Sequence, residues 1–296
     1  LRRRHPEVLF VLTMACTDPV RCELEREGFL WFEDPQRAVA AAAASMRFGR
    51  TAIMRGSDSA PWPRIDVPRG PLNEVQSKRI LAHAGIAFPP ERVAHSADAA
   101  RGAARELGFP VALKVVSADI PHKSDVGGVR LDLRDEPEVA KAFLEIMQAV
   151  ASRCPHARVD GVLVSAMVRG GVETVLGVMH DAVFGPGVMF GMGGTHVELV
   201  RDVAFRLAPF GADTARQMIE ETLAGRALKG VRGSAGADIA SLADTLARLS
   251  GFAASHADLI RSIDLNPYVA KSSGGCALDA LVVPTACCTH IEESDK

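Results

Sequence analysis

The sequence has little that suits a nucleic-acid-binding surface. Aromatic residues make up only 5% of the 296, with a single tyrosine, and 34 basic residues against 36 acidic ones leave a formal net charge of −2. Phosphate backbones are held by basic surfaces, and unpaired bases stack on aromatic rings. Both shortages therefore argue against nucleic acid as a partner. The 48% hydrophobic share is that of an ordinary globular protein.

Long apolar runs and a cysteine framework are also missing. The apolar stretches at 8–13 and 38–44 are far shorter than the roughly 20 residues of a membrane helix, and the first is too short for the core of a signal peptide. None of the six cysteines forms C-x-x-C, and no Cys/His set has the spacing of a zinc site. We therefore expect a cytoplasmic protein with reduced thiols and no contact with a membrane.

Residues 1–54 are predicted to form a β-α-β-α segment, with strands near 8–13 and 29–32 and a helix that begins at Pro35. Two strands cannot make a stable parallel sheet by themselves, because both faces and both edges need cover. Since the chain also starts with Leu1 instead of Met, we expect this segment to be the end of a longer α/β domain. Residues 55–71, dense in Pro, Gly and Ser, read as a linker.

A second domain is predicted over 72–285, followed by a tail at 286–296. Asn73 can cap its first helix, and 111–116 reads as a strand rich in β-branched residues. Further helices are expected near 213–224 and 238–250, and strands near 259–265 and 277–283. Strands outnumber a simple β-α alternation after residue 160, which favours an α+β fold over a doubly wound sheet.

The richest chemistry lies at 114–129. Lys114 stands in an apolar strand, where an unpaired ammonium is costly to bury and a phosphate is a suitable partner. Gly127 and Gly128 would let backbone N–H groups approach phosphate oxygens. His122 could act as a base or a nucleophile. Taken alone, these residues could equally be an edge-strand lysine, a flexible hairpin and a solvated histidine.

Oxygen ligands gather near the end of the domain. Asp264 and Asn266 close the strand near 259–265, and Asp279 falls inside the strand expected at 277–283. If those strands pair as a hairpin, Asn266 and Asp279 converge, and a carboxylate with an amide oxygen suits Mg²⁺. The other interpretation is a turn, a cap and an edge-strand charge. The glycine-rich run at 184–194 fits either a backbone that passes close to a ligand or two tight turns.

The order of these segments is similar to a known family. The runs H-K-S-D-V-G-G-V at 122–129, F-G-M-G-G at 190–194, E-L-V-R-D at 198–202 and D-L-N-P at 264–267 resemble the ATP-grasp domain of NDP-forming acyl-CoA synthetases. That group includes acetate–CoA ligase (ADP-forming) and the succinyl-CoA ligase β subunit. Residues 1–50 resemble the last βα units of its flavodoxin-like ligase domain. The resemblance implies an α+β ATP-grasp fold of two α+β subdomains, preceded by a partial flavodoxin-like α/β segment.

The resemblance also implies residue roles. His122 would be a transient phosphohistidine on a mobile loop, which Asp264 would orient once it is phosphorylated. Asn266 and Asp279 would hold Mg²⁺. ATP would contact the phosphate-binding residues Lys114, Gly127 and Gly128, the hinge residues Val164, Ser165 and Met167, and Glu173 near the ribose.

The implied reaction interconverts acid, ATP and CoA with acyl-CoA, ADP and phosphate, with ATP and Mg²⁺ as cofactors. The family's CoA-binding domain and second phosphohistidine find no counterpart here, so the chain would need them as partners from the same polypeptide or another subunit. A carboxylate–amine ligase of the ATP-grasp type is an alternative, against which the H-K-S-D loop argues. A regulatory nucleotide-binding module is the other alternative.

Overall fold

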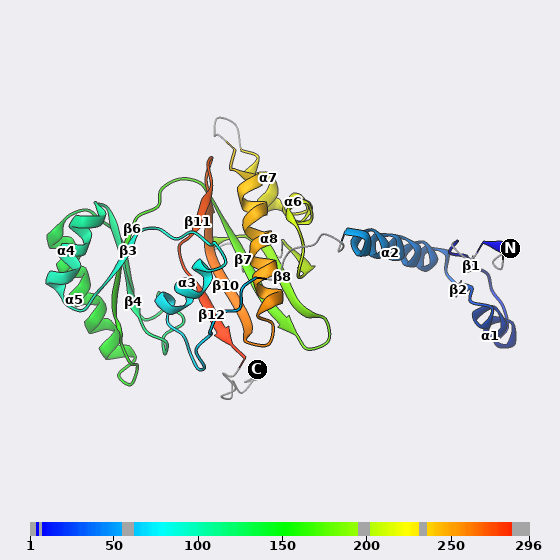
Figure 1. The fold of residues 1–296 in the computed structure, drawn as a ribbon, viewed down its shortest axis with the longest axis horizontal. Coiled ribbons are helices and arrows are strands. Elements are labelled where there is room, and N and C mark those ends of the chain that lie inside the picture. Colours follow the sequence, from blue (N-terminus) through cyan, green and yellow to red (C-terminus); the bar gives the residue numbers. More distant parts are fainter. Residues whose placement is uncertain (1–3, 6–7, 55–61, 195–201, 231–235, 286–296) are drawn as a thin grey trace. The chain divides into compact units, whose positions relative to one another are not determined.

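The computed structural model describes residues 4–5, 8–54, 62–194, 202–230 and 236–285. The chain divides into two compact units, Leu1–Asp58 and Ser59–Lys296 (Figure 1). The sequence run 198–201, which belongs to the family resemblance, the first part of the expected linker and the expected tail lie outside the described residues. No helix in the described ranges is long and apolar enough to cross a membrane.

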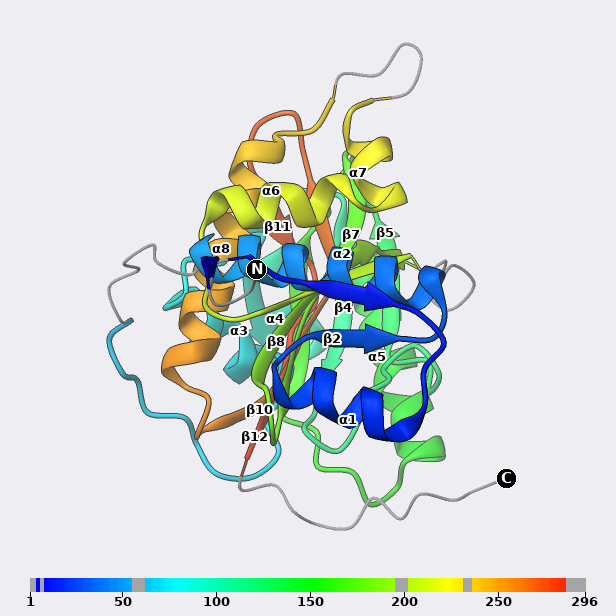
Figure 2. The same ribbon diagram turned by 90° about the vertical axis from the view of Figure 1, so that its right-hand side faces the viewer.

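The first unit contains two short parallel strands joined by one crossover helix, and a second helix follows them. It contains β1 (Val11–Thr13), α1 (Asp18–Arg26), β2 (Leu30–Phe32) and α2 (Pro35–Met54). The two strands pair in parallel, with Val11 opposite Leu30, and Figure 2 shows them side by side. A parallel pair needs a crossover connection, which α1 supplies. The predicted parallel pairing in this segment is confirmed.

The second unit contains a smaller sheet covered by two helices. Its antiparallel strands follow the order β3 (Glu91–Ala94), β6 (Gly161–Ala166), β4 (Val111–Val116) and β5 (Val129–Leu133). The helices α4 (Ala97–Leu107) and α5 (Glu136–Arg153) cover one face. Along β4, Val111, Leu113 and Val115 enter the core with these helices, so alternation turns Lys114 to the opposite face.

A larger sheet forms the other half of this unit. Its order is β11 (Gly275–Ala277), β10 (Ile260–Ala270), β7 (Val172–Asp181), β8 (Gly185–Met192) and β9 (Val203–Leu207), and β12 (Leu281–Pro284) also pairs with β10. The helices α6 (Ala212–Glu220), α7 (Leu223–Leu228) and α8 (Ile239–Ser255) share a hydrophobic core with one face of this sheet. The predicted α+β arrangement is confirmed.

Helix α3 (Glu74–Ala82) lies between the two sheets in Figure 1. Asn73 caps it as expected, in a reciprocal capping box with Gln76. The Asn73 amide also donates to Asp160 Oδ2 at 3.0 Å, beside the smaller sheet. On the other side, Ser77 Oγ accepts from the Val282 N–H of β12 at 3.1 Å. The start of α3 is thus fixed to both sheets, which positions the site described below.

Four details differ from the sequence-based expectations. The strand expected at 277–283 is broken, and Asp279 lies in the connection between β11 and β12. The helix expected at 213–224 is two helices, because Thr222 starts α7 as its N-cap. Strand β9 had not been anticipated. Residues 62–71 contain no helix or strand, yet Trp62, Ile65 and Val67 pack against the core of the larger sheet.

Candidate active site

A cavity of about 390 Å³ opens where the β4–β5 loop, the start of α3 and the strands β10 and β12 meet. Both halves of the second unit contribute to it, and all four residues predicted as catalytic or metal-binding line it. Its polar lining includes His122 and Lys123 from the loop, Glu74 from α3, Asp264 and Asn266 from β10, and Asp279. The expected convergence of Asn266 and Asp279 is therefore present, and His122 and Asp264 line the same cavity.

The loop that carries His122 is closed by its two glycines. Gly127 has a φ of +71°, which favours glycine. At Gly128 a Cβ atom would lie 2.6 Å from Val115 Cγ1, so no larger residue fits without a shift. The Gly127 N–H donates to Ser124 O at 3.1 Å and the Gly128 N–H to Lys123 O at 2.7 Å. Both donors are used inside the loop, so a contact of these glycines with phosphate stays a prediction.

Lys114 reaches across from β4 to the connection that carries Asp279. Its Nζ donates to Leu278 O at 2.7 Å and to Glu74 Oε1 at 3.2 Å, and lies 3.8 Å from Asp279 Oδ2. The strand lysine is thus paired, as its burial requires. Through its bond to Leu278 O, Lys114 also ties the connection that carries Asp279 to the smaller sheet. Asp279 itself lines the cavity.

Lys123 follows His122 directly and bridges two carboxylates. Its Nζ lies 3.1 Å and 3.0 Å from Asp279 Oδ1 and Oδ2, and 3.1 Å from Glu74 Oε2. Burial alone would lower the pKa of the Lys123 ammonium, but Asp279 and Glu74 outweigh that effect and raise it. Lys123 is therefore a fixed positive charge beside the loop histidine.

Glu74 lies at the centre of this charge network, with a side chain only 1% exposed. It contacts three ammonium groups, those of Lys78 at 2.7 Å, Lys123 at 3.1 Å and Lys114 at 3.2 Å. Burial alone would raise the pKa of the Glu74 carboxyl, but the three lysine charges lower it to about 2. One ionised carboxylate thus organises a lysine from α3, a lysine from β4 and a lysine from the His122 loop.

The pKa of Asp264 is shifted in the opposite direction to that of Glu74. Its pKa is raised by partial burial and by the charge of Asp279, and His122 opposes that rise. Asp264 therefore lies within electrostatic range of both the loop histidine and the expected metal ligand. A carboxylate in this position can orient an imidazole and stabilise its cationic form.

Asn266 owes its position to an irregularity in β10. The pairing of β10 with β7 shifts between Leu265 and Tyr268, where Pro267 has no N–H to give to the ladder. The Asn266 side-chain oxygen accepts from the Gly194 N–H at 3.3 Å. The glycine-rich end of β8 is thus tied to the D-L-N-P run, and the amide oxygen is held near the cavity.

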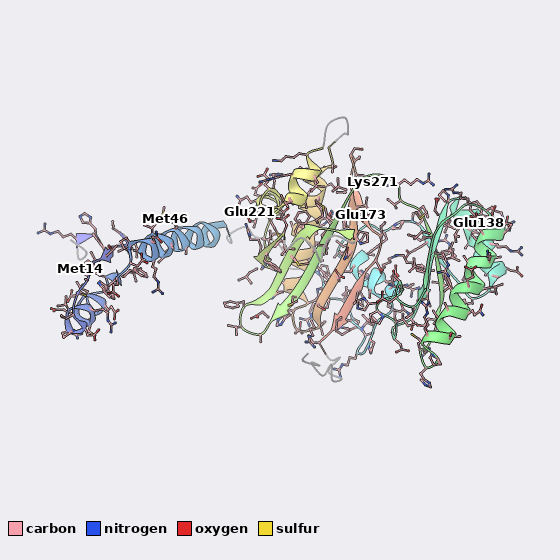
Figure 3. The ribbon with its side chains drawn as sticks, turned by 180° about the vertical axis from the view of Figure 1, so that it is seen from behind. Met14, Met46, Glu138, Glu173, Glu221 and Lys271 are labelled. Atoms are coloured by element: carbon pink, nitrogen blue, oxygen red, sulfur yellow. The ribbon has the colours of Figure 1, made fainter. Side chains whose placement is uncertain are left out.

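The predicted nucleoside-binding residues lie apart from this cavity. Val164 and Ser165 are buried in β6, with the Val164 side chain in the core under α4 and α5. The Met167 N–H donates to Pro110 O at 3.1 Å. Glu173, labelled in Figure 3, comes from β7 of the larger sheet. None of these residues lines the cavity that holds His122, so their roles stay predictions.

The side-chain oxygens of the cavity suit a hard divalent cation that takes few of its ligands from the protein. Asp279 and Asn266 supply carboxylate and amide oxygens, which Mg²⁺ prefers. Among the residues that the structure describes, no three His, Cys, Asp or Glu side chains gather into a metal site built from protein alone. A cation here would have to complete its coordination with other oxygens, such as those of phosphates.

Comparisons with known proteins identify the family of the second unit. Residues 65–283 match the ATP-grasp domain family. Acetate–CoA ligase [ADP-forming] I of Archaeoglobus fulgidus is 39% identical over 275 residues, 88% of this chain and 39% of that protein. Its Pyrococcus furiosus counterpart, subunit beta, is 38% identical over 72% of this chain and 91% of the subunit.

A solved structure extends the match to three dimensions. Acetyl-coenzyme A synthetase 1 of Ca. Korarchaeum cryptofilum was solved with coenzyme A and Mg-AMPPCP, its phosphohistidine segment pointing towards the nucleotide binding site. It matches with a TM-score of 0.62 and 39% identity, over 71% of this chain and 91% of that one.

The second unit is thus an ATP-grasp domain with two α+β subdomains, as expected from the sequence. More narrowly, the chain belongs to the family of ADP-forming acetate–CoA ligases, as its similarity to nearly the whole P. furiosus β subunit shows. It spans about two fifths of the length of the A. fulgidus enzyme.

Two residues of the site had no role in the sequence-based account. Glu74 sits in the first turn of a capped helix, where an acidic residue needs no special explanation. Lys123 looks like a solvated loop residue in the sequence. Their partners lie 40 residues away on β4 and 156 residues away beside β12. No local pattern contains that information.

Proposed function

We propose that this chain is the ATP-grasp portion of an ADP-forming acyl-CoA synthetase, in which His122 accepts the γ-phosphoryl group of ATP. The observation that carries the proposal is the shared cavity. It places the loop histidine with Asp264, Asn266 and Asp279 from the opposite half of the domain, beside the lysine pair Lys114 and Lys123.

The proposed step is a nucleophilic displacement at phosphorus. A ring nitrogen of neutral His122 attacks the γ-phosphorus, a new N–P bond forms, and the bond from phosphorus to the β–γ bridging oxygen breaks to release ADP. The positive charge gained by the imidazole is balanced by Asp264. Lys114 and Lys123 would neutralise phosphate charge, and Asp279 and Asn266 would hold Mg²⁺, whose chemistry is to offset the charge on the phosphate oxygens.

The remaining chemistry needs partners. We propose that CoA and the carboxylic acid bind to other domains, on the same polypeptide or on another subunit. The A. fulgidus alignment covers a larger share of this chain than residues 65–296 do, so it continues into the residues before Ile65. This supports the proposal that residues 1–54 are the end of a flavodoxin-like ligase domain, joined to the ATP-grasp domain through residues 55–71.

ADP–ATP isotope exchange tests this function in the absence of acid and CoA. A phosphohistidine formed reversibly predicts that labelled ADP enters the ATP pool when Mg²⁺ is present, and that Asp279→Ala slows this exchange by at least about 100-fold. Asp213→Asn, an exposed change on α6, serves as the control and should leave the rate unchanged. Nucleotide binding without exchange would favour the regulatory module or the carboxylate–amine ligase and contradict the proposal.

A further inference from the structure

A charge cluster adjoins the cavity, and every ammonium group in it has a carboxylate partner. Lys78 pairs with Glu74 and Glu91, both at 2.7 Å, and Lys114 pairs with Glu74. Lys123 lines the cavity and contacts both Glu74 and Asp279. Three lysines therefore face three carboxylates, and the cluster is neutral before any ligand enters.

Both carboxylate oxygens of Asp279 have a partner in this arrangement. Lys123 Nζ lies within 3.1 Å of both of its carboxylate oxygens, and Oδ1 also accepts the Ala280 N–H at 2.9 Å. Magnesium binds carboxylate oxygens at about 2.0–2.1 Å. A cation on the oxygen that Lys123 contacts at 3.0 Å would then lie within about 5 Å of that ammonium, and two positive charges so close repel strongly. A metal on this carboxylate would therefore bind against the repulsion of the Lys123 ammonium.

Glu74 and Asp279 would be affected differently if the Lys123 ammonium moved away from them. Glu74 would keep Lys78 at 2.7 Å and Lys114 at 3.2 Å, so its buried charge stays compensated. Among the described residues, Asp279 would keep Lys114 at 3.8 Å and one backbone N–H. Departure of Lys123 thus leaves Asp279 in need of a cation and leaves the rest of the cluster intact.

We infer that the Lys123 ammonium and a divalent cation are alternative occupants of the Asp279 carboxylate, so that metal binding releases the loop that carries His122. This inference rests on the proposed function and adds to it a positioning role for Lys123. Lys123 holds the loop against Asp279 while the metal is absent. Once displaced, its ammonium can pair with the phosphates that accompany the metal, and His122, the preceding residue, is freed with it.

Binding of Mn²⁺ alone, measured by electron paramagnetic resonance without nucleotide, tests the competition. Lys123→Met is expected to lower the Mn²⁺ dissociation constant at least about fivefold, because the competing cation is gone. Lys123→Arg keeps the charge and should bind Mn²⁺ within about twofold of the unchanged chain. Lys141→Met, an exposed change on α5, should have no effect.

Two outcomes would overturn the inference. One is a Mn²⁺ dissociation constant that Lys123→Met leaves unchanged or raises. The other is a metal affinity that Asp279→Asn does not weaken, since the metal would then bind elsewhere.

The unchanged chain supplies a second measurement that does not depend on the folding of any variant. Acetic anhydride modifies free amines, and peptide mass spectrometry reports the modification of Lys123 relative to exposed Lys141. Adding Mg²⁺ without nucleotide should raise the relative reactivity of Lys123 several-fold, and an unchanged or lowered reactivity would contradict its release. Because neither readout involves phosphoryl transfer, failure of this inference is distinguishable from failure of the ADP–ATP exchange.

Discussion

Glu74→Gln is expected to lower the free energy of unfolding by about 3–5 kcal/mol at pH 7, the range seen when one partner of a buried ion pair is removed. The glutamine would leave three ammonium groups without their shared carboxylate. Lys78 would keep Glu91 and Lys123 would keep Asp279. Lys114 would keep Leu278 O and a contact with Asp279 at 3.8 Å, so it loses its nearest carboxylate and bears most of the loss. Urea unfolding measures the change.

The effect of Glu74→Gln should depend on pH in one direction. Because the folded-state pKa of Glu74 is about 2, below its ordinary value of 4.5, its contribution is complete above about pH 4.5 and is lost as the pH falls towards 2. Glu136→Gln, which removes an exposed pair with Arg105, should cost less than about 1 kcal/mol. A loss at Glu74 of under 1 kcal/mol at pH 7, or one independent of pH, would contradict this account of the network.

Asp264→Asn is expected to make the fold more stable at pH 7 and ADP–ATP exchange slower. The raised pKa of Asp264 means that the folded protein disfavours the ionised form, so the native residue destabilises the fold at neutral pH and this penalty fades as the pH falls through its raised pKa. The asparagine should therefore unfold at a higher urea concentration than the native chain at pH 7, and the difference should shrink in acid.

The same change should slow ADP–ATP exchange by about 10²–10⁴-fold, the usual range for loss of a group that assists proton and charge transfer at the reacting atom. A variant that is both less stable at pH 7 and unchanged in exchange would show that Asp264 has neither the environment nor the role assigned to it. Asp213→Asn again provides the control, because its carboxylate is exposed on α6.

The elements that the sequence predicts well are those with strong local signals. The β-branched run at 111–116 is β4, and the Asn73 capping box starts α3 where the sequence indicates. The sequence does not predict strand β9, because the alternation of large and small residues in it is inverted. Small Ala204 faces the core, whereas Phe205 is 56% exposed. Since strands are recognised by large apolar residues on one buried face, such a strand gives a misleading pattern.

The candidate site was predictable in part for a similar reason. His122, Asp264 and Asn266 lie in short distinctive runs, and the cavity unites them with Asp279. Asp279 was expected inside a strand, but the chain leaves the sheet there, and Lys114 holds that connection by its bond to Leu278 O. The Glu74 network depends on contacts between an α3 side chain, a strand, a loop and a distant turn, which only the folded chain brings together.

Detection of a phosphohistidine at position 122 tests the central claim most directly. The chain is incubated with γ-labelled ATP and Mg²⁺, and protein-bound label is followed in acid and in base. The account predicts label that is lost in acid and stable in base, absent from His122→Ala and retained in His156→Ala, a change at an exposed histidine. Label that persists in His122→Ala, or that is absent from the unchanged chain while ATP still binds, would contradict it.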